Sequence, residues 1–284
     1  MSHTEFNLTA ADGNSLFGMS WVPSEPRAVV CLIHGLGEHI GRYDHVARHF
    51  NQAGIAVYGI DQRGHGRNQG KKGHASCQVL WDDVESLMIE ARLQHLDQPM
   101  FLYGHSWGGN IVINFLLRRG SGEIKASILS SPWLQLSFEP SNWQLTLSRW
   151  MSKIYPGFTQ SNGLFPEYLS RDASVGEAYL NDPLVHDKIS AGLFTEAFSN
   201  GQYALDHADK LSIPVLVMHG TDDSITSASA SEAFSKSASE YSTLKLWPGM
   251  RHETHNELGK EEVLDYVTQW LVAKASNSCF PVHS

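Results

Sequence analysis

The chain alternates between short, uniformly apolar segments and longer segments whose apolar positions recur with helical spacing. The apolar runs, most of which end in glycine or at a turn, are 28–35, 55–61, 99–104, 124–132 and 213–220. Such runs are typical of strands buried on both faces of a parallel sheet. The alternation predicts repeated βα units, and therefore an α/β fold with a mostly parallel central sheet covered by helices. In such sheets ligands bind at the carboxyl ends of the strands.

The segments between and after these runs carry the helical pattern. Helices are predicted in "RYDHVARHFNQAG", 77–95, "WGGNIVINFLLRRG", near 225–238 and near 259–274. At the other end of the chain, "TEFNLTAADGNSLFGMSWVP" is predicted to form a hairpin that turns at Asp12-Gly13. The sheet is therefore expected to begin with antiparallel strands and to continue with parallel ones.

The interval from about 134 to 205 breaks the alternation, because it has no convincing buried-strand run and is rich in aromatic residues. One apolar stripe recurs there at helical spacing: Trp143, Leu147, Trp150 and Ile154. We interpret 134–205 as a helical cap inserted into an α/β core formed by 1–133 and 206–284. The stripe either packs against the core or forms a hydrophobic lid that contacts lipid and admits acyl chains.

Length and composition narrow the class of protein. The 284 residues suffice for one large α/β domain with a sizeable core. A formal net charge of −9 without a polybasic cluster argues against nucleic-acid binding, and it makes any peripheral membrane contact mainly hydrophobic. We see no signal peptide and no apolar run of about 20 residues. Cys31, Cys77 and Cys279 make a poor disulfide framework, so we expect a cytoplasmic protein.

A serine between glycines stands at the junction of a predicted strand and a predicted helix. Gly104-His105-Ser106-Trp107-Gly108 fits G-x-S-x-G, the pattern of a nucleophile elbow. A sharp strand-turn-helix crowds the backbone, and small residues two positions before and after the serine relieve that crowding. The helix that follows directs its N–H groups towards developing negative charge. We therefore predict that Ser106 is a nucleophile; the alternative is an ordinary turn.

A serine hydroxyl needs a base that takes its proton and a carboxylate that orients the base. On this fold the acid and then the histidine follow the serine in chain order. "PVLVMHGTDDS" supplies Asp222 and Asp223, and "WPGMRHETHNE" supplies His252 and His255. Order and loop position alone leave either aspartate and either histidine open. The spare residue of each pair would cap a helix or solvate a loop.

A second glycine-rich loop, "HGLG" (34–37), directly follows a predicted strand. Hydrolases with a nucleophile elbow place the second N–H of the oxyanion hole in such a loop. We assign the oxyanion hole to the backbone N–H groups of Leu36 and Trp107. One such donor typically contributes about 3–4 kcal/mol.

Six segments spread over nearly the whole chain resemble the monoglyceride lipase and lysophospholipase branch of the α/β-hydrolase superfamily. They are "HGLGEHIGRY" (34–43), "DQRGHGRNQG" (61–70), "GHSWGG" (104–109), "SR" (170–171) with "YLNDPL" (179–184), "HGTDD" (219–223) and "PGMRH" (248–252). In this branch the acid lies three residues after the glycine of "HG", and the base is the first histidine after "PG-x-x". By similarity, the acid is Asp223 and the base is His252.

The resemblance also implies a polar end of the substrate pocket. Glu38, Arg42 and His255 occupy positions that help to form this end in the lipases. Tyr179 corresponds to a cap tyrosine that helps to cover the glycerol end. We treat these four as substrate-binding candidates; the alternative is a purely structural Glu–Arg–His network.

Three residues depart from the pattern of the lipases, one of them Asn68, which stands where serine is commoner. Trp107 stands where methionine is usual, and Leu36 stands where alanine is frequent. Both substitutions leave the backbone N–H in place. Their larger side chains are expected to narrow the acyl channel.

These observations predict a serine hydrolase that cleaves lipid carboxylic esters without a cofactor. The resemblance implies monoacylglycerol as the substrate, cleaved to glycerol and fatty acid through an acyl-enzyme on Ser106. The alternatives are a lysophospholipase or general carboxylesterase and, in another class, a ligand-sensing protein without turnover. The pairs His45/His49 and His252/His255 lack a third ligand at a zinc spacing, so no metal is expected.

Overall fold

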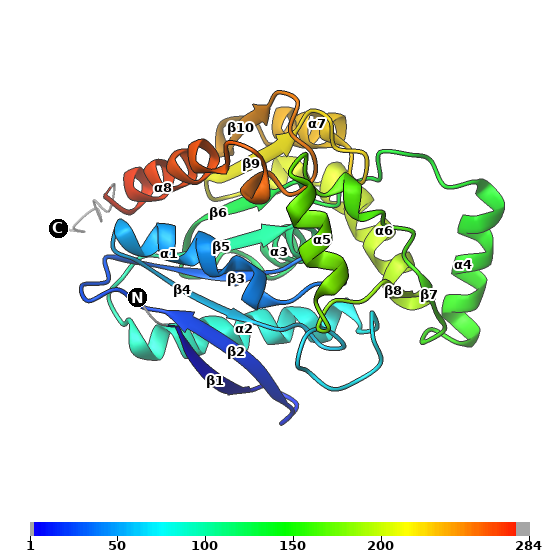
Figure 1. Cartoon of the computed structure of the whole chain (residues 1–284), viewed down its shortest axis with the longest axis horizontal. Helices are drawn as coiled ribbons and strands as arrows, with labels where there is room; N and C mark the ends of the chain where they lie inside the picture. The colour runs from blue at the N-terminus through cyan, green and yellow to red at the C-terminus, as the bar shows by residue number, and fades with distance from the viewer. Residues whose placement is uncertain (1–2, 277–284) are drawn as a thin grey trace.

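An eight-stranded sheet runs through the computed structural model, which describes residues 3–276 (Figure 1). In spatial order its strands are β1 (Thr4–Thr9), β2 (Ser15–Trp21), β4 (Ile55–Ile60), β3 (Ala28–Ile33), β5 (Met100–His105), β6 (Ile124–Ser130), β9 (Val215–Gly220) and β10 (Ser242–Trp247). The hairpin β1–β2 joins β4 antiparallel, and all other neighbours pair in parallel. Every residue of β3, β4, β5 and β9 is buried, which confirms the interpretation of the apolar runs.

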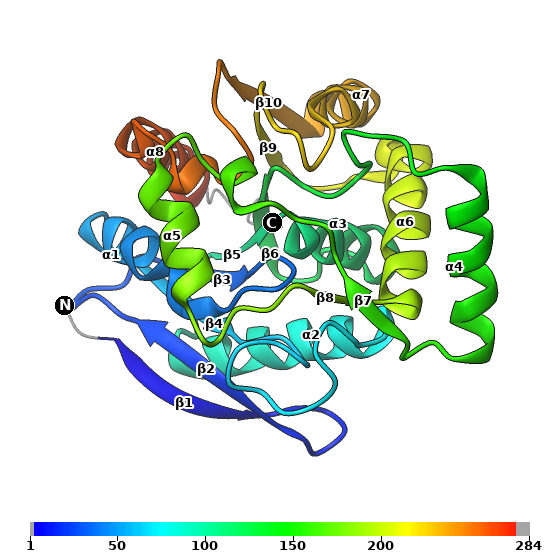
Figure 2. The same ribbon diagram turned by 45° about the vertical axis from the view of Figure 1, so that its right-hand side comes forward.

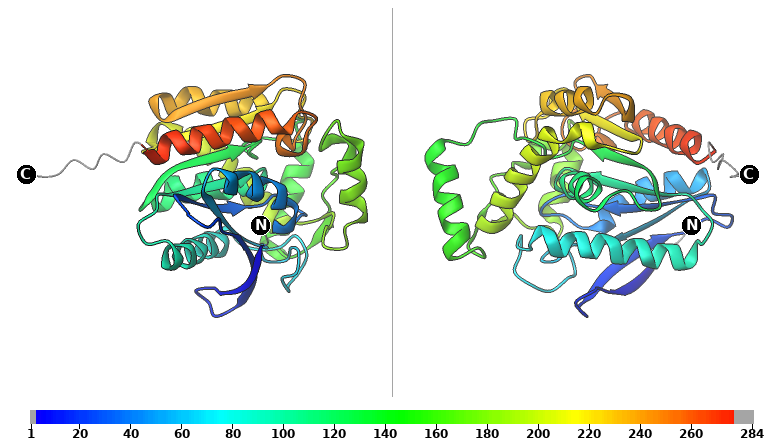
Figure 3. Two further views of the ribbon diagram at one scale, coloured as in Figure 1. Left: turned by 60° about the vertical axis from the view of Figure 1, so that its left-hand side comes forward. Right: turned by 180° about the vertical axis from the view of Figure 1, so that it is seen from behind.

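Helices cover both faces of the sheet (Figure 3). One face packs against α1 (Asp44–Gln52) and α8 (Lys260–Ser276). The other face packs against α2 (Cys77–Gln94), α3 (Trp107–Arg119), α6 (Ala191–Asp206) and α7 (Ala228–Ala238). Side chains of each buried strand alternate between the two cores, as the pleat of a strand requires. Short 3₁₀ helices lie in the loops, at Ile40–Tyr43, Pro166–Tyr168, Ala208–Lys210, Ser239–Tyr241 and Thr254–Asn256.

The interval 134–205 is mainly helical but also contains two short strands. It comprises α4 (Asn142–Ile154), β7 (Thr159–Ser161), α5 (Ala173–Asn181), β8 (Lys188–Ser190) and α6. The strands β7 and β8 pair antiparallel, and neither was expected from the pattern. Figures 1 and 2 place α4 at the outer edge of the molecule, beyond α6.

Helix α6 joins this interval to the core. Three of its apolar residues belong to the same cluster as α3 and the sheet: Leu193, Ala197 and Ala204. Two buried asparagines of α3 tie the helices together, because Asn110 Nδ2 donates to the carbonyl of Ala197 and Asn114 Nδ2 to that of Asn200, each at 3.0 Å. The interval therefore contributes one helix to the core layer of the sheet.

The apolar stripe of α4 is exposed. Trp143, Leu147, Trp150 and Ile154 keep 66, 49, 58 and 61% of their surface in contact with solvent. The alternative that this stripe packs against the core is therefore wrong. Within residues 3–276, none of the helices has both the length and the apolar character that a membrane crossing requires.

Candidate active site

The parallel strands bring four loops of the chain to one edge of the sheet. The loop that begins at His34 follows β3, and Ser106 follows the neighbouring strand β5. Asp223 follows β9, and His252 follows its neighbour β10. Residues up to 218 positions apart, from 34 to 252, are therefore assembled by topology alone at the edge where ligands of open α/β sheets bind.

Ser106 adopts a strained backbone conformation between β5 and α3, with φ 53° and ψ −116°. Residues other than glycine rarely occupy this region, and the surrounding structure must hold them there. Here the Ser106 N–H donates to the carbonyl of Ser130, and the Ser106 carbonyl accepts from the N–H of Trp133, both at 2.9 Å. The elbow is therefore fixed by bonds to the next strand and its loop.

The glycines of the elbow allow close backbone contact. A Cβ atom on Gly104 would lie 2.4 Å from the carbonyl oxygen of Gly108. A Cβ atom on Gly108 would lie 2.2 Å from the carbonyl oxygen of Ile33 at the end of β3. The expected crowding two positions either side of the serine is thus present, and it involves backbone atoms that cannot move aside.

Asp223 and His252 form a buried pair. Nδ1 of His252 lies 2.7 Å from Oδ2 of Asp223. Oδ1 of Asp223 accepts the N–H groups of Ile225 at 2.8 Å and Thr226 at 3.0 Å. Because Nδ1 faces a carboxylate, it carries the proton, and Nε2 of His252 is left free to act as a base.

Each member of the pair shifts the pKa of the other towards its charged form. Burial by itself would raise the pKa of the Asp223 carboxyl, but the charge and hydrogen bonds of His252 and His219 hold that pKa well below its usual range. For His252, burial by itself lowers the pKa, whereas the Asp223 carboxylate raises it, and the net shift is upward. Asp223 is therefore ionised and stabilises a proton on His252.

The alternative candidates, Asp222 and His255, do not join this pair. Asp222 is exposed and accepts a hydrogen bond from the Thr221 hydroxyl at 3.1 Å. His255 is buried and stacks on Tyr43 at a ring-centroid distance of 5.0 Å. Among the described residues, neither ring nitrogen of His255 has a hydrogen-bond partner. Of the alternatives that the sequence left open, the structure pairs Asp223 with His252.

The loop after β3 lies beside Ser106. A Cβ atom built on Gly35 would lie 3.4 Å from the Cβ of Ser106. Gly35 donates its N–H to Oε1 of Glu38 at 2.6 Å, and the carbonyl of Gly37 accepts from the N–H of His186 at 2.9 Å. Leu36, between these two anchored glycines, is half-buried. Trp107, across from this loop, is the first residue of α3, so its N–H has no acceptor within its own helix.

A cavity of about 610 Å³ contains Ser106, His252 and Leu36 in its wall. Most of the remaining wall is apolar and comes largely from the interval 134–205, including Phe138, Leu147, Met151, Phe165 and Phe194. A cavity of this size and character suits a long apolar ligand whose polar group lies at the strand edge.

Trp107 does not line this cavity. Its side chain is fully buried and packs edge-to-face against Trp133, with ring centroids 6.1 Å apart. Trp133 lines the cavity instead, as Leu36 does. The expectation that the Trp107 side chain narrows the acyl channel is therefore wrong, because Trp133 stands between the two.

A buried charge cluster lies in the wall of the cavity. Nη1 of Arg42 lies 2.5 Å from Oε2 of Glu38, and the guanidinium also contacts both carboxylate oxygens of Glu253, at 2.7 and 2.8 Å. The Tyr179 ring lies 5.1 Å from Cζ of Arg42. All four residues line the cavity, whereas His255 does not.

Glu253 was missed in the sequence analysis, although it directly follows the candidate base. Burial by itself would raise the pKa of Glu253, but Arg42 outweighs burial and holds that pKa well below its usual range. Two carboxyl groups, those of Glu38 and Glu253, therefore share the one guanidinium of Arg42. The sequence signal that could have revealed Glu253 was the presence of an acidic residue directly after the candidate base. Such a residue could pair with Arg42 in the same way as Glu38.

Histidines elsewhere have partners of their own. Nε2 of His45 faces the carbonyl of His255 at 2.9 Å, and Nε2 of His49 pairs with Asp265 at 3.0 Å. Across residues 3–276, no three or more His, Cys, Asp and Glu side chains are grouped so that they could hold a metal ion.

The strand order, the helices on both faces and the strained serine elbow together define an α/β-hydrolase-fold enzyme (Figure 1). The chain belongs to the family described as serine aminopeptidase, S33, whose profile matches residues 24–259. It is 36% identical over 276 residues to a monoacylglycerol lipase of Mycolicibacterium smegmatis, covering 96% of this chain and 98% of that protein. This degree of likeness makes the chain a carboxylic ester hydrolase of the serine hydrolase class.

Two further comparisons agree. The crystal structure of a monoacylglycerol lipase from Paleococcus ferrophilus superimposes with a TM-score of 0.83 at 34% identity, covering 91% of this chain and 99% of that one. An uncharacterized abhydrolase domain-containing protein of Dictyostelium discoideum is 35% identical over 98% of this chain, which spans only 30% of that protein. The fold and the family expected from the six segments are thus confirmed.

Proposed function

We propose that the protein hydrolyses monoacylglycerols to glycerol and free fatty acid. The observation that carries this proposal is the cavity, whose wall contains Ser106 and His252 together with a largely apolar lining and the buried cluster of Glu38, Arg42 and Glu253. An acyl chain fits the apolar wall, and an uncharged polyol fits the cluster around Arg42. The names of the similar lipases agree with this substrate.

In the proposed reaction Ser106 Oγ attacks the ester carbonyl carbon while Nε2 of His252 takes its proton. The N–H groups of Leu36 and Trp107 bind the oxyanion, and Asp223 stabilises the imidazolium. When the intermediate collapses, the bond to the glycerol oxygen breaks and His252 protonates that oxygen. A water that gives its proton to His252 then attacks the acyl carbon. The bond from that carbon to Ser106 Oγ breaks, His252 returns the proton to Oγ, and the fatty acid is released. No cofactor takes part.

The direct test is the release of oleate from 2-monooleoylglycerol, compared with turnover of a p-nitrophenyl ester. We expect both substrates to be hydrolysed. Turnover of the p-nitrophenyl ester alone would contradict the monoacylglycerol assignment but keep the esterase chemistry. Turnover of neither would favour the ligand-sensing alternative.

The charge cluster predicts selection against anionic head groups. Because Glu38 and Glu253 share Arg42, we expect monooleoylglycerol to be hydrolysed faster than oleoylglycerol phosphate. One like charge at roughly 8–12 Å, with an effective dielectric constant near 20, gives a difference of about ten- to thirtyfold in kcat/KM. Glu253→Gln removes one negative charge and is expected to reduce this ratio. Turnover of oleoyl lysophosphatidylcholine, measured in parallel, tests the lysophospholipase alternative.

Glu261→Gln is the matched control for this comparison. Glu261 is exposed on α8, and its substitution removes the same charge from the surface. We expect it to leave the ratio unchanged. An equal ratio in the wild type and in Glu253→Gln would show that the cluster does not select substrates by charge.

We propose that residues 134–205 act as a cap over the cavity and that α4 makes transient peripheral contact with membranes. The support is the exposed apolar stripe, together with the position of Trp143 and Leu147 in both the stripe and the cavity wall. With a net charge of −9, such contact depends on apolar rather than electrostatic attraction.

Trp150→Ser is expected to weaken binding to neutral phosphatidylcholine vesicles about tenfold, as the lost burial of part of a large apolar side chain implies. Co-sedimentation measures this effect. Trp150 does not line the cavity, so esterase activity on a soluble substrate serves as a check that the fold is intact. Leu96→Ser is the control, because Leu96 is 71% exposed and lies beyond the end of α2 remote from α6. Equal losses in both variants would contradict a specific role of α4.

We propose a cytoplasmic location for the enzyme. Its support is that Cys31 and Cys77 are buried and unpaired, as in a reducing compartment. Cys279 lies outside the described residues.

A further inference from the structure

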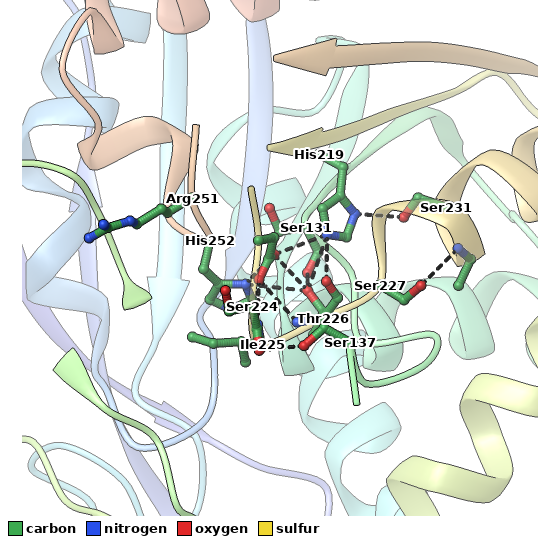
Figure 4. Close-up of polar contacts among 12 residues, drawn as sticks. Ser131, Ser137, His219, Ser224, Ile225, Thr226, Ser227, Ser231, Arg251 and His252 are labelled. Atoms are coloured by element: carbon green, nitrogen blue, oxygen red, sulfur yellow. Dashed lines mark hydrogen bonds and ion pairs between the residues drawn. The ribbon is translucent and has the colours of Figure 1, made fainter. Parts of the chain in front are cut away.

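Asp223 has a second histidine partner, His219, which no part of the proposed reaction uses. His219 is the penultimate residue of β9, and its side chain is fully buried. Its Nε2 lies 3.0 Å from Oδ2 of Asp223, the same oxygen that His252 contacts. In Figure 4 the rings of His219 and His252 both point towards Thr226, whose hydroxyl lies 3.3 Å from each ring.

The partners of His219 determine where its proton lies. Nε2 faces two acceptors, the Asp223 carboxylate and the carbonyl of Thr226 at 3.2 Å, so Nε2 must carry a proton. Nδ1 lies 2.8 Å from Oγ of Ser231, a fully buried hydroxyl of α7 that donates to Nδ1 in the neutral ring. Ser231 thus keeps His219 in the tautomer that donates to Asp223.

Three side-chain donors lie within hydrogen-bonding distance of Oδ2 of Asp223. His252 lies at 2.7 Å, the Thr226 hydroxyl at 2.9 Å and His219 at 3.0 Å. The single proton of the Thr226 hydroxyl also has the Ser131 carbonyl as an acceptor, at 3.1 Å. The other oxygen, Oδ1, is held by two backbone N–H groups. His219 therefore supplies a second imidazole donor to the carboxylate oxygen that His252 contacts.

This contact matters most before the proton is transferred. The Asp223 side chain is fully inaccessible to solvent, and burial alone disfavours its charge. While His252 is neutral and ready to act as a base, no cation at Nδ1 compensates that burial. The donors to the carboxylate in this state are the Nδ1–H of neutral His252, the two backbone N–H groups, Thr226 and His219.

We propose that His219 is a positioning residue, which holds Asp223 ionised and aimed at His252 through its Nε2–H, with Ser231 fixing the tautomer. The proposal rests on the proposed function, because it takes Asp223 as the acid that orients the base. His219 does not line the cavity, so its loss should lower kcat without changing KM.

The test compares His219→Leu, His219→Gln and Ser231→Ala with the wild type on p-nitrophenyl butyrate, which lacks a glycerol group. Leucine fills the space but has no N–H, whereas the side-chain amide of glutamine restores a donor near the position of Nε2. Loss of one hydrogen bond to a buried carboxylate should lower kcat of His219→Leu about ten- to a hundredfold with KM unchanged. His219→Gln should recover most of kcat, and Ser231→Ala should lose about two- to fivefold.

A spectroscopic signature separates positioning from a general structural role. The Nδ1–H proton between His252 and Asp223 should give a far-downfield ¹H NMR resonance, which should shift or broaden in His219→Leu and return in His219→Gln. Full kcat in His219→Leu would overturn the proposal. So would equal losses in the leucine and glutamine variants at unchanged unfolding temperature, because the N–H would then be irrelevant.

One outcome would test the proposed function rather than the role of His219. Equal turnover in the wild type and Ser106→Ala would refute the proposed function itself, whatever His219 does.

If His219→Leu does not fold, His219→Gln and Ser231→Ala test the proposal without it. Near-normal kcat in His219→Gln with reduced kcat in Ser231→Ala supports the proposal, and unchanged kcat in Ser231→Ala overturns the role of the tautomer.

Discussion

Replacing Ser106 by alanine will lower kcat for ester hydrolysis by a factor of about 10⁴ or more, because the acyl-enzyme cannot form without the nucleophile. Substrate binding should change little, since the Ser106 side chain contributes one hydroxyl to a large, mostly apolar cavity. The elbow should persist, because the bonds that fix it involve the backbone of Ser106 rather than its side chain. Steady-state kinetics with a p-nitrophenyl ester measure the loss.

Ser131→Ala provides the matched control. Ser131 is a buried serine after β6 that also has a positive φ, 44°, and its hydroxyl has no hydrogen-bond partner among the described residues. Removing this hydroxyl is expected to leave kcat within about twofold of the wild type. Turnover that survives in Ser106→Ala would show that another group attacks the ester.

Asp223→Asn is expected to be nearly as damaging, with a loss in kcat of about 10⁴-fold. The two backbone N–H groups at Oδ1 require an acceptor there, so the new NH₂ group must take the place of Oδ2. At that position it meets Nδ1–H of His252 and Nε2–H of His219, both of which are donors. His252 must then change tautomer or lose its orientation, and in either case Nε2 is no longer a base aimed at Ser106.

Asp222→Asn is the neighbouring control, because Asp222 is exposed and its carboxylate contacts only a threonine hydroxyl among the described residues. We expect wild-type kinetics from this variant. If Asp222→Asn is the inactive one, the pairing of Asp223 with His252 is not the catalytic arrangement.

The pH profile gives a second measurement on the same pair. His252 acts as a base only when its ring is neutral, so kcat/KM rises with pH as the ring loses its proton. Because the Asp223 carboxylate raises the pKa of His252, the midpoint of this acid limb should lie above 6.5 in the wild type. In Asp223→Asn the carboxylate is gone, and the midpoint of the residual activity should move to lower pH.

The parts of the fold that sequence reasoning predicted well are those with one dominant physical cause. β3, β4, β5 and β9 are buried on both faces, so all their residues except His105 and His219 are apolar, aromatic or small, and the runs are visible in the sequence. The strands β7 and β8 have three residues each and are partly exposed, so no apolar run marks them. The environment of the α4 stripe could not be predicted either. Helical spacing identifies an apolar face, but it does not show whether that face is buried or exposed.

In the candidate site, too, some residues could be predicted from the sequence and others could not. Ser106 is marked by glycines that the backbone crowding requires, and the order of loops brings the acid and the base after it. Spacing alone did not separate Asp222 from Asp223, because the choice depends on which side chain turns inward. Glu253 and His219 were missed because their roles arise from contacts with Arg42 and Asp223, which lie far away or across a turn.

The two asparagine bonds between α3 and α6 restrict how the cavity can open. Moving α6 away from α3 would leave the buried amides of Asn110 and Asn114 unpaired, at a cost of about 1–3 kcal/mol each. Gly201 of α6 also packs directly against the backbone of Leu134, where the interval begins. Helix α4 in turn packs along α6, and the hydroxyls of Ser148 and Thr195 lie 3.2 Å apart between them. The apolar wall that these helices give to the cavity is therefore braced against the sheet through α6.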